Sequence, residues 1–195
     1  KEDLNSILAL TGLPEHLDVS RDWLIVSCYI GQRSASLLKL TKRDINTASQ
    51  TITLQQVKTK AFVTIPILPP VKAILDKYNG EFPPRLQRTD HYNYDCYNRN
   101  IKEVCKLAGV NEVCTGRVNR QGSNKSKVVQ LPKYQLVTSH IGRRTYATLL
   151  YGKVNLQALM QVTGHQSEVN FLKYVNKGRI IDTEAIRREF TKALE

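Results

Sequence analysis

The apolar residues of this chain recur at helical spacing along most of its length and alternate in two shorter stretches. The dense apolar run "SRDWLIVSCYI" (20–30) predicts a buried helix that Gly31 interrupts, and "SASLLKL" resumes helical character. "TITLQQV" and "AFVTIPI", joined by "KTK", predict a β-hairpin. Pro69 and Pro70 precede a short helical pattern, "VKAILDKY". "DHYNYDCYNRNIKEVCKLAGV" then predicts a long helix closed by Gly109.

The second half of the chain has a different texture. Between 113 and 137, two apolar segments flank the polar, basic tip "NRQGSNKS", which predicts a second hairpin or an extended arm. Three helical segments follow: 140–152, "NLQALMQVTG" ending at Gly164, and "SEVNFLKYVNKG" ending at Gly178. The last stretch, "DTEAIRREFTKALE", is amphipathic. The whole pattern predicts one α+β domain that is mainly α-helical, with small antiparallel hairpins.

The charge balance narrows the class of partner. The chain has 195 residues, and its 29 Lys+Arg against 17 Asp+Glu give a formal net charge of +12. Such an excess indicates a polyanionic partner, and nucleic acid fits better than a membrane because no long apolar run or basic amphipathic helix is present. Composition alone leaves ribosomal proteins, repressors and nucleases open. The four cysteines include no CxxC pair, so we expect reduced thiols in a cytoplasmic protein rather than a zinc site or a disulfide framework. The sequence also shows no signal-peptide pattern.

The stretch "VTSHIGRRTYATLLYG" (137–152) has an unfavourable charge pattern for a helix start. Thr138 and Ser139 are natural N-caps, so we expect the helix to begin there. Its first turn carries three basic residues, His140, Arg143 and Arg144. The N-terminal end of a helix is the positive end of its dipole, so these residues predict a bound anion such as phosphate. The alternative is a solvated basic turn. On a helical wheel, Arg143 lies beside the apolar stripe and should be partly buried, whereas Arg144 faces solvent.

An arginine and two lysines in the first half are further candidates. Arg33 lies at the interruption between two apolar helical runs, where a buried cation must either pair with a carboxylate, such as Asp44, or contact a ligand. Lys58 and Lys60 lie on the turn of the first hairpin. A lysine in such a turn is most often only a solvated charge, but it can also carry an ammonium group into a groove of DNA.

Two candidates lie near the end of the chain. His165 follows Gly164 at a helix end, where a histidine is commonly only a partner for the helix dipole. Tyr174 lies at the edge of an apolar helical face. By itself, this position predicts a core tyrosine whose hydroxyl reaches water.

The order of these motifs carries more information than any one of them. "GQR", a hairpin lysine, "SHIGRRTYATLLY", "TGH" and a tyrosine nine residues later resemble the catalytic domain of the tyrosine recombinase (phage integrase) family. The resemblance spans about residues 20–178, and its most specific parts are His140-x-x-Arg143 at a helix start and Gly164-His165 followed by Tyr174. The segments "SHIGRRTYAT" and "TGHQSEVNFLKY" are most similar to integrases of Bacteroides-type mobile elements and phages.

The resemblance implies a set of catalytic roles. The family's positions fall on Arg33, Lys58, His140, Arg143, His165 and Tyr174. Arg33 and Arg143 would clamp the scissile phosphate, and the two histidines would complete its pocket. Two arginine forks suit this chemistry, because negative charge on the phosphate oxygens grows toward the transition state.

The resemblance also assigns the leaving group and the nucleophile. Lys58 would protonate the leaving 5′ oxygen. It is preferred to Lys60, the alternative, because the family's lysine commonly precedes Thr at this turn. Tyr174 would attack the phosphate. One departure is visible, since many members carry an acidic residue three positions after the first arginine and this chain has Ser36.

The implied activity is site-specific recombination. Such an enzyme cleaves and rejoins double-stranded DNA at att-like crossover sites through a covalent 3′-phosphotyrosine, and it integrates or excises a mobile element or phage. It needs no metal, ATP or cofactor, forms a homotetramer on DNA from a protein that is monomeric in solution, and acts in the bacterial cytoplasm near the nucleoid. Basic residues expected to follow the DNA backbone are Lys60, Arg117, Arg120, Lys125, Lys127 and Arg144.

The resemblance implies a domain organisation too. Residues 1–195 would form the catalytic domain, with the motifs within 20–178 and a C-terminal helix over 179–195. That helix could dock on a neighbouring protomer or on its own domain. The family's N-terminal core-binding domain is expected to be absent ahead of residue 20, so the chain by itself should bind DNA weakly.

Two other functions stay open from the sequence. A type IB topoisomerase-like relaxase uses similar residues without assembling two DNA sites. A non-catalytic DNA-binding regulator would share the basic charge, but simple binding requires no aligned Tyr174.

Overall fold

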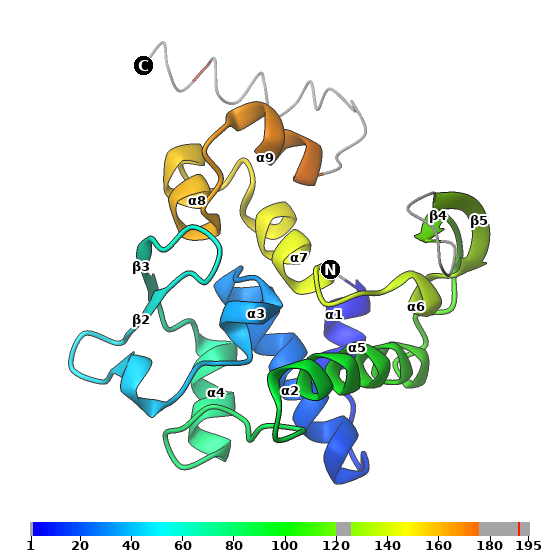
Figure 1. Cartoon of the computed structure of the whole chain (residues 1–195), viewed down its shortest axis with the longest axis horizontal. Helices are drawn as coiled ribbons and strands as arrows, with labels where there is room; N and C mark the ends of the chain where they lie inside the picture. The colour runs from blue at the N-terminus through cyan, green and yellow to red at the C-terminus, as the bar shows by residue number, and fades with distance from the viewer. Residues whose placement is uncertain (1, 120–125, 176–190, 192–195) are drawn as a thin grey trace.

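The computed structural model describes residues 2–119, 126–175 and 191 (Figure 1). Its α-helices are α1 (Glu2–Leu8), α2 (Glu15–Ile30), α3 (Ser34–Leu37), α4 (Pro69–Lys77), α5 (Asp90–Leu107), α6 (Lys133–Leu136), α7 (Ile141–Leu150), α8 (Leu156–Thr163) and α9 (Glu168–Val175). A 3₁₀ turn, η1 (Lys42–Asp44), precedes the strands β1 (Ile45–Asn46), β2 (Thr51–Gln55) and β3 (Phe62–Pro66), and β4 (Val113–Asn119) and β5 (Ser126–Pro132) follow α5. The predicted mainly α-helical α+β fold is confirmed.

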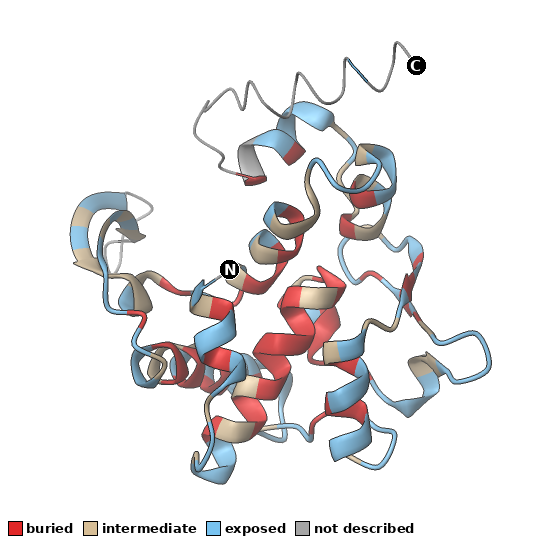
Figure 2. Cartoon of the chain, turned by 180° about the vertical axis from the view of Figure 1, so that it is seen from behind, coloured by how far each residue is buried: buried red, intermediate tan, exposed pale blue. Residues whose placement is uncertain are grey.

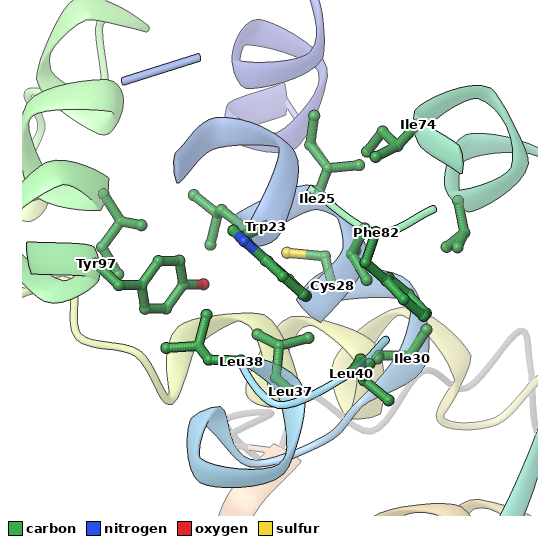
Figure 3. Packing of buried hydrophobic residues seen from close by; sticks show 14 of the residues in the cluster. Trp23, Ile25, Cys28, Ile30, Leu37, Leu38, Leu40, Ile74, Phe82 and Tyr97 are labelled. Carbon is green, nitrogen blue, oxygen red and sulfur yellow. The ribbon is translucent and has the colours of Figure 1, made fainter. Parts of the chain in front are cut away.

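Helix α2 is the centre of the molecule, with α4, α5 and α7 packed around it (Figures 1 and 2). It begins at Glu15 after Pro14, earlier than the sequence predicts, and the hydroxyl of Ser20 donates to the carbonyl of His16 at 2.7 Å instead of starting the helix. Trp23 stacks on Phe82 with ring centroids 5.9 Å apart, inside a cluster that also includes Tyr97 (Figure 3). This continuous apolar core makes α2 a rigid base for the segment that follows it.

The strands form two small antiparallel sheets. The predicted first hairpin is confirmed, with Ile52 opposite Ile65 and Leu54 opposite Val63. These four side chains are buried while the residues between them face solvent, as expected for a sheet with one covered face. Strand β1, which the sequence analysis did not predict, extends this sheet at the β2 edge. The predicted arm is also confirmed, because β4 and β5 pair over their full lengths and project from the helical body (Figure 1).

Two helical segments differ from the prediction, and two predicted segments lie wholly or mostly outside the described residues. Helix α1 was not predicted, and the segment after Gly31 gives only the short helix α3 rather than a longer one. The tip of the arm (120–125) and most of the last amphipathic stretch fall outside the described residues. No helix in the described part of the chain is both long enough and apolar enough to cross a membrane.

One buried acid holds α2 to the helix α4. Asp22 is 1% exposed, and its carboxylate lies 2.8 Å from Arg21 Nη2 and 2.6 Å from Lys77 Nζ. The hydroxyl of Tyr78 donates to the same carboxylate at 2.9 Å. Opposite charges and a hydroxyl group therefore surround this acid, as a buried charge requires.

Candidate active site

The first part of the site is the corner at the end of α2. Gly31 adopts φ of 66°, and a Cβ atom there would lie 2.5 Å from Cδ1 of Tyr146 on α7, so glycine is required twice over. The chain then turns sharply and places Arg33 at the N-cap of α3, partly buried. Asp44, the partner suggested by the sequence, has another role: it closes a capping box with Thr41, accepting from its backbone N–H at 2.8 Å.

The second part is the start of α7. The prediction that Thr138 or Ser139 caps this helix is wrong, because His140 occupies the N-cap position and its side chain makes no capping hydrogen bond. Ser139 is buried and bonded to α5 instead: its backbone N–H donates to Asn98 Oδ1 at 2.8 Å, and its hydroxyl contacts the hydroxyl of Tyr94 at 3.1 Å. These contacts fix the loop immediately before His140.

Arg143 joins separate segments of the chain. It is 1% exposed, more deeply buried than the helical wheel predicts, whereas Arg144 faces solvent as expected. Its guanidinium donates to the carbonyl of Gly31 at 3.1 Å and to the carbonyl of Thr163 at the end of α8. One side chain thus connects the turn that carries Arg33 to the turn that precedes His165.

His165 is held in a defined orientation. It follows the left-handed Gly164 that ends α8, and its ring packs edge-on against Phe171 at a centroid distance of 5.3 Å. Its Nδ1 lies 2.8 Å from the hydroxyl oxygen of Thr163, and that hydroxyl donates its single proton to the carbonyl of Leu159 at 2.6 Å. The contact therefore requires His165 to donate through Nδ1, so the neutral ring keeps its lone pair on Nε2.

The electrostatics show that the basic residues share one site. The pKa of His165 is lowered to about 4, first by burial and then by the positive charges of Arg143 and Arg33. The pKa of His140 is lowered in the same direction, by desolvation and then by Arg143, Arg33 and Arg144. Burial and neighbouring positive charges both favour neutral imidazoles, and an anion among these residues would offset the part of the shift that the arginines cause.

The predicted hairpin lysines lie on the exposed turn between β2 and β3. Lys58 and Lys60 are both exposed, and Lys60 occupies a left-handed turn position with φ of 59°. The turn is fixed to α3, because the backbone N–H of Val57 donates to the hydroxyl of Ser36 at 3.1 Å. Ser36, the departure from the family pattern, therefore supports the lysine turn through a neutral hydrogen bond.

The predicted nucleophile lies on α9. Tyr174 belongs to this helix, although its side chain falls outside the described part of the structure. The helix packs on α7 and α8 through Phe171 and Val175, which join Tyr146 and Leu159 in a second apolar cluster. The backbone of Tyr174 is thus carried by the same packing that orients the ring of His165.

The predicted DNA-contacting residues of the arm divide into two groups. Arg117 on β4 and Lys127 on β5 are exposed on neighbouring strands. Arg120 and Lys125 lie outside the described residues. Among the described residues, no group of three His, Cys, Asp or Glu side chains is arranged to hold a metal ion.

The sequence pattern does not single out the polar residues that fix this site. Gln32 and Gln56 are each 1% exposed, and Thr163 is fully buried. Gln32 lies inside the "GQR" motif, yet nothing in the sequence distinguishes a buried glutamine from a solvated one. Such contacts depend on residues that are far apart along the chain.

Solved structures provide the comparison. No family model matches the chain, and no curated protein matches it at the sequence level. XerA recombinase is 16% identical with a TM-score of 0.60, covering 99% of this chain and 63% of its own. The XerH site-specific recombinase, in its post-cleavage complex with a palindromic difH substrate, is 17% identical with a TM-score of 0.64. The match covers 95% of this chain and 49% of the XerH chain.

A transposon enzyme gives a similar result. The Tn1549 transposon integrase, solved in complex with transposon right end DNA, is 16% identical with a TM-score of 0.61, covering 98% of this chain and 64% of its own. This chain therefore spans between about half and two thirds of the length of these three structures. At such low identity the likeness concerns the fold, and that fold is the one the motifs imply. The chain has the fold of a tyrosine recombinase catalytic domain.

Proposed function

We propose that this chain is the catalytic domain of a site-specific recombinase that cleaves and rejoins DNA through a covalent 3′-phosphotyrosine on Tyr174. The observation that carries the proposal is that buried Arg143 donates to the carbonyls of Gly31 and Thr163, which joins the segment that carries Arg33 to the segment that carries His165. The pKa values of His140 and His165 are lowered by burial and then by Arg143 and Arg33, in agreement with this arrangement. Basic groups from separate segments repel one another at one place. A phosphodiester would relieve that repulsion.

The two arginines would stabilise the transition state. Arg33 and Arg143 are permanently charged, and charge on the non-bridging phosphate oxygens increases as the nucleophile attacks. Arg143 is fixed by two backbone carbonyls before DNA arrives, so its guanidinium needs little reorganisation during the reaction. Loss of one such preorganised donor typically lowers the rate by about 10²–10³.

The histidines would change protonation state when the phosphate binds. The pKa values of His140 and His165 lie low in the free protein, so both are neutral near pH 7. A bound phosphate raises those pKa values, because it offsets the charge of the arginines. A protonated His165 could donate from Nε2 to the phosphate while Nδ1 stays bonded to Thr163, and the neutral ring could instead accept a proton there.

Lys58 and Tyr174 would complete the reaction. The phenol oxygen of Tyr174 forms the new bond to phosphorus, and its proton passes to a histidine or to water. The P–O5′ bond breaks, and the leaving O5′ takes a proton from the ammonium of Lys58. The phosphotyrosine conserves the energy of the phosphodiester, so the reverse attack by a 5′ hydroxyl rejoins DNA without ATP.

The substrate would be double-stranded DNA at crossover sites of a phage or another mobile element. This choice among recombinases rests on the resemblance of "SHIGRRTYAT" and "TGHQSEVNFLKY" to integrases of mobile elements, because the fold is shared alike with XerA, XerH and a transposon integrase. The net charge of +12 and the exposed Arg117 and Lys127 support contact with the DNA backbone. The chain would act in the bacterial cytoplasm as a tetramer on DNA, with the segment over 179–195 docking on a neighbouring protomer or on its own domain.

A nicked suicide duplex carrying the element's crossover site tests the proposal. The nick lets a short 5′ product diffuse away, so the covalent protein–DNA adduct accumulates and is measured on a denaturing gel. The adduct should form in EDTA and disappear in Tyr174→Phe. Persistence of the adduct in that variant would exclude Tyr174 as the nucleophile, and a hydrolysed product that requires a divalent metal would exclude the mechanism.

The products separate recombination from the other candidate functions. Holliday junctions and recombinants between two labelled duplexes are expected of a recombinase. Relaxed plasmid without junctions would indicate a relaxase. Tight DNA binding without any adduct would indicate a regulator.

A further inference from the structure

Two buried glutamines, Gln32 and Gln56, connect the turn that carries Lys58 to the segments that carry Arg33 and His165. Gln56 Nε2 donates to Gln32 Oε1 at 2.9 Å and to the carbonyl of Val162 at 3.0 Å. Gln32 Nε2 donates to the same carbonyl at 2.8 Å and to the carbonyl of Ile30 at 3.2 Å. Both side chains are 1% exposed. The bond between the two glutamines and the bond to Ile30 are buried, and the two bonds to Val162 are partly buried.

The pair connects segments that are distant in the sequence. Gln32 is the residue between Gly31 and Arg33, Gln56 ends the β2 side of the hairpin, and Val162 lies in the last turn of α8. A buried amide costs free energy unless its donors and acceptor are satisfied, and these bonds exist only in one relative placement of the segments. The pair therefore specifies where the hairpin lies relative to Arg33 and His165.

Gln56 also organises the turn that carries Lys58. Its side-chain Oε1 accepts from the hydroxyl of Thr59 at 2.7 Å, one residue beyond Lys58. Its backbone carbonyl accepts from the N–H of Lys60 at 2.8 Å, and its backbone N–H donates to the carbonyl of Ala61 at 2.9 Å. The residues on both sides of Lys58 are thus held by one glutamine, and Ser36 holds Val57 in addition.

The space around Gln56 leaves little alternative. A Cβ atom on Gly164 would lie 2.2 Å from Gln56 Oε1, so only glycine at this left-handed position admits the amide. Gly164 directly precedes His165, and its neighbour Thr163 provides a carbonyl to Arg143. The amide therefore contacts the turn that carries one proposed catalytic residue while bonding the turn that carries another.

We infer that Gln32 and Gln56 are positioning residues that hold the Lys58 turn against the segments that carry Arg33 and His165, so that the ammonium of Lys58 reaches the leaving 5′ oxygen. This inference rests on the proposed function. A flexible lysine on an exposed turn would otherwise sample many positions, and a displacement of about 1 Å can cost about 10²-fold in rate. The glutamines act through Lys58 and touch no DNA.

A substrate with a better leaving group tests this role. A 5′-bridging phosphorothiolate replaces the leaving oxygen with sulfur, and the electron pair of the broken P–S bond stays on sulfur as a thiolate. A thiol has a pKa of about 8.5, so the thiolate departs without a proton from Lys58. Gln56→Met should slow cleavage of ordinary DNA by about 10- to 100-fold and should cleave the phosphorothiolate within about threefold of the unsubstituted chain.

Three variants complete the experiment. Lys58→Ala should show the same rescue by sulfur and defines its full extent. Gln32→Met should show the same pattern with a smaller loss, because Gln56 keeps its bonds to Thr59 and Val162 and the fold is retained. Gln157→Met is the matched control, since this glutamine is exposed on α8, and it should cleave both substrates normally.

Specific results would overturn the inference. It is wrong if Gln56→Met and Gln32→Met cleave ordinary DNA at the normal rate, or if their loss persists on the phosphorothiolate while Lys58→Ala is rescued. The inference is also wrong if the phosphorothiolate does not restore cleavage by Lys58→Ala. An adduct that depends on Tyr174 would still support the proposed function in that case. Absence of any adduct from the unsubstituted chain refutes the proposed function itself.

Discussion

Two clusters of buried charge lie against α2, and they are built in opposite ways. Around Asp22, an acid meets Arg21, Lys77 and the hydroxyl of Tyr78, so the charges compensate one another. At the other end of the helix, Arg33 and Arg143 add to each other's field, and both neighbouring histidines have lowered pKa values. The first cluster joins charges of opposite sign, whereas the residues named in the second are all basic. Under the proposed function, a DNA phosphate would bind among the basic residues.

This difference separates structural charge from functional charge. Compensated charges hold elements together, and their removal changes the free energy of unfolding. Accumulated charges of one sign cost stability in the free protein and return it when a ligand of the opposite sign binds. Perturbation of each cluster should therefore change a different measurement.

The largest effect is expected in the basic cluster of Arg33, Arg143 and the two histidines. Arg143→Ala should lower the rate of adduct formation at saturating DNA by about 10²–10³, because a preorganised donor to the phosphate is lost. Urea unfolding should also show a loss of stability, since Arg143 bonds the carbonyls of Gly31 and Thr163.

Arg144→Ala is the matched control for this arginine. Its side chain is exposed one position further along α7, so the substitution should change DNA affinity more than the rate. A similar loss of rate in both variants would contradict the distinction between the buried and exposed arginines.

The compensated cluster should respond in stability alone. Asp22→Asn should reduce the free energy of unfolding by about 2–3 kcal/mol, because Arg21 and Lys77 would lose a buried partner. The rate of adduct formation by folded protein at saturating DNA should stay within about twofold. Asp76→Asn removes an exposed i,i+4 pair with Lys72 and should cost less than about 1 kcal/mol. An equal loss in both variants would show that burial of Asp22 is not what matters.

The histidines give a pH signature of the basic cluster. His165 has a pKa of about 4 in the folded chain against 6.5 for an unperturbed histidine, so the unfolded chain binds the proton first. Stability should be unaffected above pH 6.5 and should fall as the pH drops from 6.5 toward 4. His165→Gln should flatten this part of the curve, measured by urea unfolding, while His91→Gln, on an exposed position of α5, should leave it unchanged.

The smallest effect per residue is expected on the arm, where cations face water. Arg117→Ala with Lys127→Ala should reduce the slope of log affinity against log salt by about 2 while changing the rate at saturating DNA little. Lys72→Ala with Lys106→Ala removes the same charge from lysines that already pair with acids on their own helices. An equal change of slope in both double variants would mean that only net charge matters.

The sequence predicted much of this molecule because much of it is encoded locally. The spacing of apolar residues predicts the hairpin over Thr51–Gln55 and Phe62–Pro66, which is confirmed. The crowding of basic residues near His140 predicts an anion site, which stays a prediction. Helix starts were less accurate. Ser139 has the chemistry of an N-cap, yet its contacts with Tyr94 and Asn98 on α5 determine its place.

The fold class, the positive charge and the order of the motif residues follow from the sequence alone; these residues are Arg33, His140, Arg143, His165 and Tyr174. Tertiary structure alone decided that Arg143 bonds the carbonyls of Gly31 and Thr163 and that Gln32 meets Gln56. The physical reason is that hydrogen bonds between residues so far apart depend on how complete elements pack. Local propensity selects the elements, and packing around α2 selects their partners.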